Sequence, residues 1–302
     1  MSEITKTTET IIPRMAWREW LQTLVVLFKL RVVSLLLLAA VGGAFFGARG
    51  WPGLGTLVLV LVTGGMAAAG ASALNQYLER FTDLNMSRTR SRPLVIGSFA
   101  RPQLVPVVGV LLIVLPCLAV LPFNPALAFY LLLGAVIYVG VYTIWLKPRT
   151  LLNIVIGGAA GSAAVMSGGA AANASSDVAV ITLALLVFLW TPTHFWSLAL
   201  LYRQDYQKAS FPMLPAQVTP RQSAWWVLAH TLPTGLAAIL LASTPGLGWL
   251  YGLAAVGLTL ELLYRNIRLI AAPTAKNARR LFISSNYYLM AVLLVICLDV
   301  VL

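Results

Sequence analysis

Residues 54–77 read LGTLVLVLVTGGMAAAGASALNQY, an apolar stretch without a single charged side chain. A helix that crosses a bilayer needs about 20 predominantly apolar residues. A transmembrane strand would belong to a closed barrel and would alternate apolar and polar residues. The run VLVLVTGG within this stretch shows no such alternation. The stretch therefore predicts a transmembrane helix.

Stretches of the same kind recur along the whole chain. Of its 302 residues, 60% are hydrophobic and 10% are charged, whereas soluble domains carry about 25% charged residues. This composition excludes a soluble domain, a disordered chain and a disulfide scaffold. We expect nine spans, at roughly residues 24–47, 54–77, 103–121, 126–146, 151–172, 178–201, 223–243, 246–264 and 281–301. The predicted fold is all-α: a polytopic membrane protein whose nine helices surround a central cavity open to the cytoplasmic side.

The positions of the positive charges support this map. Cytoplasmic loops of membrane proteins are enriched in Lys and Arg. With the N-terminus inside, all 21 Lys and Arg residues except Arg49 fall on the cytoplasmic side. We therefore expect an integral membrane protein with a cytoplasmic N-terminus and an external C-terminus. The net charge of +12 then reflects topology and contact with anionic lipid, and does not indicate nucleic-acid binding.

The chain divides into a short tail and one long domain. Residues 1–20 carry Glu3, Glu9 and Glu19 and lack the early apolar segment and cleavage site of a signal peptide. We expect residues 1–20 to form a polar cytoplasmic tail and residues 21–302 to form a single transmembrane domain.

Acids and bases follow one another where the second expected span ends. Asn75, Glu79 and Asp83 are spaced i, i+4 and i+8, which places them on one face of a continuous helix. Mg²⁺ in proteins is typically bound by one or two carboxylates together with substrate phosphates. Arg88 and Arg92 follow closely, and guanidinium groups match phosphate oxygens in bidentate fashion. This spacing favours a magnesium–diphosphate site. The alternative is a solvated helix end whose acids pair with Arg80 and Arg88.

The fourth and sixth expected spans end with polar residues at the same membrane level. The fourth ends with Tyr142 and Lys147, a phenol and a cation suited to a diphosphate. The sixth is followed by Arg203 and Asp205, which we expect at the depth of Asp83. Because even-numbered spans all end on the cytoplasmic side, the sequence predicts one pocket there.

His194 lies inside the sixth expected span, about 11 residues before Asp205 and hence about 16 Å deeper in the membrane. Ionisable residues at membrane depth are functional candidates, and histidine is a common axial ligand of haem iron. The alternative for His194, and equally for His230, is a hydrogen bond to a backbone carbonyl of a neighbouring helix.

These residues resemble the UbiA-type intramembrane prenyltransferases, and more narrowly the branch that farnesylates protohaem IX. Its first acidic motif resembles Asn75-xxx-Glu79-xxx-Asp83 with the following MSRTRSRPL. The haem branch is indicated by PTHFW and by Asp205-Tyr206 leading to PMLP. The matching stretches are KLRV at 29–32, MSRTRSRPL at 86–94, YTIWLK at 142–147, NIVIGGAAG at 153–161, PTHFW at 192–196 and PMLP at 212–215.

The resemblance implies a Mg²⁺-dependent enzyme. It would transfer the farnesyl group of farnesyl diphosphate to a vinyl group of haem B with hydration, giving haem O for haem-copper oxidase maturation. The implied catalytic and metal-binding residues are Asn75, Glu79, Asp83 and Asp205. The residues expected to bind the diphosphate are Arg88, Arg92, Lys147, Tyr142 and Arg203, and the residue expected to bind haem is His194.

Four residues depart from the family pattern, among them Leu30 where Pro is usual and Ser210 where Gly is usual. Glu79 stands where Asp is usual, and Gln204 stands where a second acid often precedes Asp205. Either Asp205 alone holds a second metal ion, or one ion is shared by the whole site. These departures also leave an aromatic acceptor, such as a quinone or chlorophyll precursor, as the alternative substrate.

The alternative class of protein is a membrane transporter. Transporters place polar groups near the midplane of the bilayer, whereas the charge in this chain gathers at one face. The partners expected for the enzyme are farnesyl diphosphate, haem B, the lipid bilayer and a haem-modifying enzyme or oxidase assembly factors, with no nucleic acid. The expected location is a bacterial inner membrane.

Overall fold

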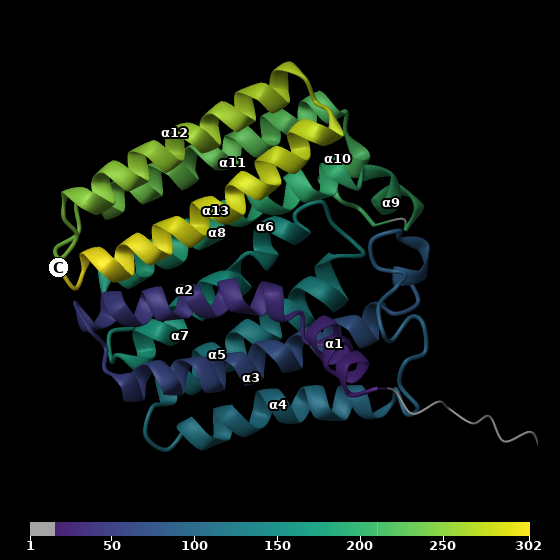
Figure 1. Ribbon diagram of the computed structural model, residues 1–302, viewed down its shortest axis with the longest axis horizontal. Coiled ribbons are helices and arrows are strands. Elements are labelled where there is room, and N and C mark those ends of the chain that lie inside the picture. The colour runs from purple at the N-terminus through teal and green to yellow at the C-terminus, as the bar shows by residue number, and fades with distance from the viewer. Residues whose placement is uncertain (1–15, 210) are drawn as a thin grey trace, which may run out of the picture.

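The computed structural model describes residues 16–209 and 211–302. Within these ranges the regular structure is entirely helical, which confirms the all-α class. The long helices lie side by side along the longest axis of the molecule (Figure 1). Residues 1–15 of the expected tail lie outside the described residues, and α1 begins at Trp17, so that residues 17–20 of that tail are already helical.

Most of the chain lies in long helices joined by short connections. The long helical segments are α2 (Leu30–Ala48), α3 (Leu54–Glu79), α4 (Leu104–Val120), α5 (Pro125–Ala135) with the π-helix η2 (Val136–Leu146), α6 (Asn153–Gly157) with α7 (Ala159–Ala171), α8 (Val178–Leu201), α11 (Pro220–Leu241), α12 (Trp249–Ala271) and α13 (Ala275–Asp299). The short elements are α1 (Trp17–Leu27), the 3₁₀-helix η1 (Asp83–Asn85), α9 (Arg203–Lys208) and α10 (Leu214–Gln217).

Among the described residues, seven of these segments are long and apolar enough to cross a membrane. They are α2, α3, α5 with η2, α6 with α7, α8, α11 and α13, and they confirm seven of the expected spans. The other two expected spans coincide with α4, which has only 17 residues, and with α12, which carries Glu261, Arg265 and Arg268. Membrane crossing by α4 and α12 stays a prediction, as does a central cavity open to the cytoplasmic side.

Two expected span boundaries differ from the structure for identifiable reasons. The first span does not begin near residue 24, because Lys29 adopts a left-handed conformation with φ of 49°, which few residues other than glycine adopt. The chain turns there, and α1 is separated from α2. The last span begins at Ala275, ahead of residue 281, because the Thr274 hydroxyl caps the helix by accepting a hydrogen bond from the Asn277 backbone N–H at 3.3 Å.

Glycines allow the helices to pack closely. A Cβ atom on Gly168 of α7 would lie 1.7 Å from the Ala40 carbonyl oxygen of α2, and one on Gly43 of α2 would lie 2.1 Å from the Val165 carbonyl oxygen. A Cβ on Gly70 of α3 would meet the Gly109 carbonyl oxygen of α4 at 2.4 Å. Small residues permit such close approach in membrane bundles. These contacts fix α3, which carries the acidic motif, within the bundle.

The two ends of the bundle differ. The short elements α1, α9 and α10 and the long connection between α3 and α4 lie together at one end (Figure 1, right). The C-terminus lies at the other end (Figure 1, left). The connection between α3 and α4 carries the acidic and basic residues that follow Glu79, so these charges are placed at the first end.

Candidate active site

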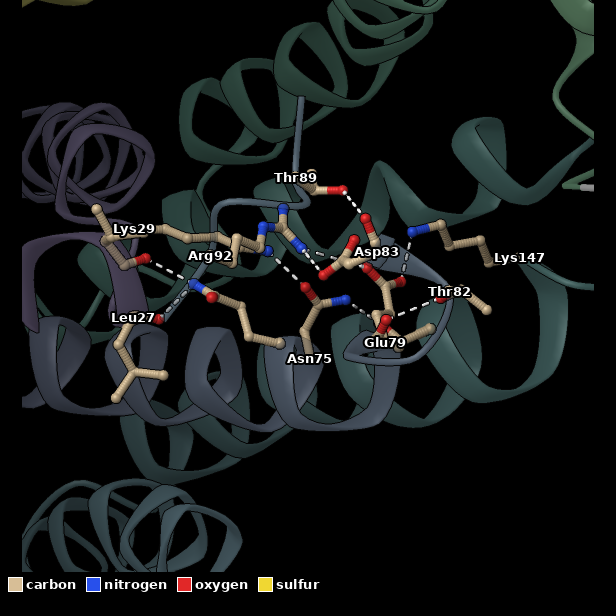
Figure 2. Close-up of polar contacts among 12 residues, drawn as sticks. Leu27, Lys29, Asn75, Glu79, Thr82, Asp83, Thr89, Arg92 and Lys147 are labelled. Atoms are coloured by element: carbon tan, nitrogen blue, oxygen red, sulfur yellow. Dashed lines mark hydrogen bonds and ion pairs between the residues drawn. The ribbon is translucent and has the colours of Figure 1, made fainter. Parts of the chain in front are cut away.

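The acidic motif lies at the end of α3 and continues into η1. Asn75 and Glu79 are 1% and 7% exposed, and they lie one turn apart on α3. Asp83, which is 3% exposed, opens η1. The expected continuous helical face therefore ends at Glu79, because α3 stops there and the chain tightens into a 3₁₀ turn. Asp83 nevertheless stays beside Glu79 (Figure 2).

Each of these two acids contacts a cation of the chain. Lys147 donates a hydrogen bond to Glu79 Oε1. Nη1 of Arg92 lies 2.5 Å from Asp83 Oδ2 and 3.9 Å from Glu79 Oε2 (Figure 2). One nitrogen atom thus stands next to both carboxylates. The pairing expected for a solvated helix end is not found: Arg80, immediately after α3, donates to the Tyr77 carbonyl oxygen.

Lys29 belongs to the same cluster, although the spacing of charges did not single it out. Its Nζ donates hydrogen bonds to Asn75 Oδ1 at 2.5 Å and to the Tyr138 hydroxyl at 3.0 Å. Burial, followed by the charge of Arg92, lowers the pKa of the Lys29 amine to about 7. The signals in the sequence are the place of Lys29 inside the first expected span and in the matching stretch KLRV. The left-handed turn described above directs this side chain toward α3.

The π-helix η2 explains how Tyr138 and Lys147 reach one cluster. On an α-helix they would face opposite sides, because nine steps of about 100° add up to two and a half turns. In η2 the hydrogen bonds close wider turns: the Lys147 backbone N–H donates to the Tyr142 carbonyl five residues earlier, at 2.8 Å. Such π-helical turns are frequent at functional sites. The wider turn brings Tyr138 to Lys29, and Lys147 to Glu79.

Tyr142 and Thr143 complete this wall of the site. The Asn75 amide Nδ2 donates to Thr143 Oγ1 at 3.0 Å. The Tyr142 ring stacks on the Tyr138 ring with centroids 5.9 Å apart, and Lys147 Nζ lies 5.9 Å from the centre of the Tyr142 ring. Tyr142 therefore lies beside the cation that we expected it to accompany.

Asp205 is joined to the loop that carries the arginines. Its Oδ2 accepts hydrogen bonds from Ser87 Oγ at 2.6 Å and from the Arg88 backbone N–H at 3.3 Å. The Arg88 guanidinium lies over the Tyr202 ring at 5.8 Å. Asp205 is 8% exposed. The short helix α9, which follows α8, and the loop after α3 thus meet, as the topology predicts. Within the described part of the chain, Asp205 contacts the loop backbone and its serine and has no ion pair with a side chain.

Arg203 is not part of the ion-paired cluster. Its Nε donates to the Pro215 carbonyl at 2.8 Å, and its Nη2 donates to the Val218 carbonyl at 3.0 Å. These two bonds hold the segment that contains PMLP against α9. The geometry therefore supports a bracing role for Arg203, and its contact with a diphosphate stays a prediction.

His194 lies in α8 with its ring fixed on both faces. The Trp190 ring stacks on one face with centroids 4.4 Å apart, and the Phe282 ring covers the other at 4.7 Å. Its Nδ1 lies 3.0 Å from Ser285 Oγ, so its partner is a hydroxyl and the expected carbonyl bond is not made. Because α8 ends at Leu201, His194 lies about 10 Å from that helix end, and its expected depth of about 16 Å relative to Asp205 stays a prediction.

The donors of the cluster suit a hard cation. Carboxylate and amide oxygens are the ligands that Mg²⁺ takes, and the position of Arg92 Nη1 shows that one cationic atom can stand beside both Asp83 and Glu79. Among the described residues, however, no three His, Cys, Asp or Glu side chains gather into a metal-binding group. The contacts bring only two acids, Glu79 and Asp83, to the same guanidinium, whereas Asp205 contacts Ser87 and the Arg88 backbone.

Sequence comparisons agree with the resemblance noted in the motifs. Residues 35–293 match the UbiA prenyltransferase family. A protein of Metallosphaera sedula named protoheme IX farnesyltransferase is 42% identical over 275 residues, covering 90% of this chain and 94% of that protein. A protein of Saccharolobus islandicus with the same name is 43% identical over 272 residues, covering 88% of this chain and 93% of that protein.

Solved structures share the fold. A digeranylgeranylglyceryl phosphate synthase superposes with a TM-score of 0.76 at 16% identity, covering 93% of this chain and 98% of that chain. A UbiA homologue from Archaeoglobus fulgidus bound to GPP and Mg²⁺ gives a TM-score of 0.64 at 17% identity, covering 91% and 99% of the two chains. From the family match and the identity to these relatives, the chain belongs to the UbiA prenyltransferase family.

Proposed function

We propose that this chain transfers the farnesyl group of farnesyl diphosphate to a vinyl group of haem B with addition of water, giving haem O for haem-copper oxidase maturation. The observation that carries the proposal is the buried ion-paired cluster of Glu79, Asp83, Arg92 and Lys147 at one end of the bundle. The name of the relatives, protoheme IX farnesyltransferase, indicates the acceptor and the prenyl group of the proposed reaction.

The metal-binding residues of the proposed enzyme are Asn75, Glu79, Asp83 and Asp205. Bound Mg²⁺ would neutralise charge on the departing diphosphate, and the homologue that binds GPP and Mg²⁺ supports this requirement. In the structure, Glu79 and Asp83 are neutralised by Lys147 and Arg92. If the two acids bound a metal ion, Lys147 and Arg92 would lose their carboxylate partners and could donate charge-assisted hydrogen bonds to the diphosphate oxygens.

The remaining chemistry depends on where charge develops. The C1–O bond of farnesyl diphosphate breaks, and its electron pair leaves with the diphosphate. We expect Lys29, Arg88, Arg92 and Lys147 to donate hydrogen bonds to this leaving group. The allylic cation that remains is stabilised by the aromatic face of Tyr142, which already attracts Lys147 at 5.9 Å.

The acceptor step then completes the product. The terminal vinyl carbon of haem B forms a bond to C1 of the farnesyl group. The positive charge that this leaves beside the porphyrin is quenched when a water molecule adds and loses a proton, which gives the hydroxyl of haem O. We assign the orientation of the haem to His194, the imidazole held between Trp190 and Phe282.

We also propose that the chain crosses the membrane nine times with its N-terminus in the cytoplasm, so that the cluster faces the cytoplasmic side. The crossings by α4 and α12 are included because both helices coincide with expected spans. The relatives named above come from archaea, so we propose a cell membrane, bacterial or archaeal, as the location.

The test is a comparison of two aspartate variants in membranes supplied with haem B and farnesyl diphosphate. Asp83→Asn should reduce haem O formation and diphosphate release at least about 100-fold, because charge stabilisation at the leaving group is lost. Asp177→Asn, which alters an acid paired with Arg49 far along the sequence, should leave both unchanged. Chelation of Mg²⁺ should abolish both activities. Full activity of Asp83→Asn would contradict the proposed site.

A further inference from the structure

Ser285 on α13 contacts two side chains of α8. Its backbone carbonyl accepts a hydrogen bond from Trp190 Nε1 at 2.8 Å, and its hydroxyl oxygen lies 3.0 Å from His194 Nδ1. Ser285 is fully buried. The residues that it joins, Trp190 and His194, stack on one another. One serine therefore fixes both members of an aromatic pair that is 91 residues or more away in sequence.

The contacts leave one edge of the imidazole available. Trp190 and Phe282 cover the two faces of the His194 ring, and Ser285 holds Nδ1. Among the residues that the structure describes, none forms a hydrogen bond with Nε2. The ring is therefore prevented from rotating, while its second nitrogen has no hydrogen-bond partner within residues 16–209 and 211–302.

We propose that Ser285 is a positioning residue that holds the His194 ring with Nε2 directed to the iron of the haem substrate. This inference rests on the proposed function and adds to it a residue on α13. The cluster that binds the prenyl donor lies on α3 and η2, whereas this pair lies on α8 and α13.

The positions of the protons agree with this role. An imidazole that gives the lone pair of Nε2 to a metal carries its proton on Nδ1, and the partner of Nδ1 sets this tautomer. Ser285 Oγ then accepts the hydrogen bond from Nδ1–H. The serine's own O–H has an acceptor in the Phe282 carbonyl oxygen, 2.8 Å away in the same helix. Both hydrogens are thus satisfied when Nε2 serves as the ligand.

His230 on α11 provides the internal comparison. Its ring packs edge-on against the Trp196 ring, with centroids 5.1 Å apart. Its Nδ1 is buried without a hydrogen-bond partner among the described residues. Nothing in these contacts sets the tautomer of His230, whereas His194 has a hydroxyl partner and two aromatic walls. The two histidines of the chain are therefore expected to differ in haem binding.

The test uses the purified full chain loaded with haem B, in four variants. Ser285→Ala should weaken haem binding about 10- to 100-fold, the usual loss when the partner of a metal-bound histidine is removed, and should lower the Fe–His stretching frequency in resonance Raman spectra. Ser285→Thr restores the hydroxyl and should recover both. His194→Ala should remove the Fe–His band. Ser223→Ala, which removes a buried hydroxyl bonded only within its own helix, is the matched control and should change nothing.

The outcomes separate this inference from the function on which it rests. If His194→Ala keeps the Fe–His band, the assignment of His194 as haem ligand is wrong. If His194→Ala loses the band but Ser285→Ala behaves as the parent protein, haem ligation stands and the role of Ser285 is overturned. Folding of Ser285→Ala is checked by thermal unfolding; the Trp190 bond goes to the backbone, so the substitution leaves it in place.

Discussion

The two ends of the helical bundle both carry ion pairs, but those at one end are buried and the one at the other end is exposed. At the end that holds the acidic motif, Glu79, Asp83 and Lys147 are each more than nine-tenths buried. Lys147 pairs with Glu79, and Arg92 pairs with Asp83 and lies 3.9 Å from Glu79. At the other end, Arg49 pairs with Asp177 at 3.2 Å with 69% of the arginine side chain exposed, beside a cavity of about 510 Å³.

This contrast indicates that the buried ion pairs, and not the exposed one, belong to the site of chemistry in this chain. Exposed ion pairs contribute about 0–1 kcal/mol to stability. Buried charges cost several kcal/mol to remove from water, and the pair repays that cost only with good geometry. A buried cluster of acids and bases is therefore poor evidence of selection for stability alone, and here it agrees with a role in binding a charged substrate.

Removing the lysine of the buried cluster should have the largest effect. Lys147→Met leaves Glu79 buried with Arg92, at 3.9 Å, as its remaining ion-pair partner among the described residues, and should lower the free energy of unfolding by about 3–5 kcal/mol and abolish haem O formation. Thermal unfolding in detergent and pigment analysis measure the two effects. The double variant Glu79→Gln with Lys147→Met should recover most of the stability and none of the activity. A single variant as stable as the parent would show that the pair is not buried.

Replacing the bridging guanidinium should have a smaller effect that is confined to substrate binding. Arg92→Lys keeps the charge but cannot stand beside both acids or grip a phosphate with two parallel bonds. We expect the KM for farnesyl diphosphate to rise about 10-fold, equivalent to about 1.4 kcal/mol, with the unfolding temperature nearly unchanged. Arg90→Lys, in the same loop but without a contact to either acid, is the control. Equal effects of both variants would contradict the bridging role.

Lys29 lies at the edge of the cluster, where its hydrogen-bond partners among the described residues are Asn75 and Tyr138 and not an acid. Lys29→Met should raise the KM for farnesyl diphosphate several-fold, because one of the cations facing the diphosphate is lost, while Lys29→Arg should restore part of it. Steady-state kinetics with diphosphate release as the readout measures both. If Lys29→Met has the kinetics of the parent, Lys29 only supports Asn75 and Tyr138.

The exposed pair at the other end should matter least. Arg49→Gln should change the free energy of unfolding by no more than about 0.5 kcal/mol and leave haem O formation at the parental level. A decrease of several kcal/mol in the free energy of unfolding, or a loss of haem O formation, would contradict the proposed difference between the two ends. Unfolding of Arg49→Gln measured beside Lys147→Met in the same detergent gives the direct comparison.

The sequence predicts the parts of this molecule that depend on local pattern. Apolar stretches of about 20 residues locate the helices that meet the criteria for crossing, and the spacing of Asn75 and Glu79 places them on one face of α3. The grouping of acids and bases at one end follows from the charge bias of the loops. These features need only the order of residues along the chain.

Other parts could not be predicted, because they depend on conformations or partners that one sequence does not encode locally. Nothing in the apolar residues of η2 signals a π-helix, so the shared direction of Tyr138 and Lys147 is visible only in the structure. Arg203 could as well have faced a phosphate as the carbonyls of Pro215 and Val218. Ser285 lies in a stretch whose sequence indicates only an apolar span, and its contact with His194, 91 residues away in sequence, is visible only in the structure.

The π-helical segment has a consequence for how this chain tolerates changes of length. Each of its hydrogen-bonded turns contains one residue more than an α-helical turn, and that surplus keeps Lys147 on the same side as Tyr138. Deleting Gly140, where an added Cβ would meet Val136 Cγ1 at 4.0 Å, would retain every reactive side chain, yet in an ordinary helix the eight remaining steps of about 100° would turn Lys147 about 80° away from the side of Tyr138. For η2, the number of residues is as much a chemical requirement as their identity.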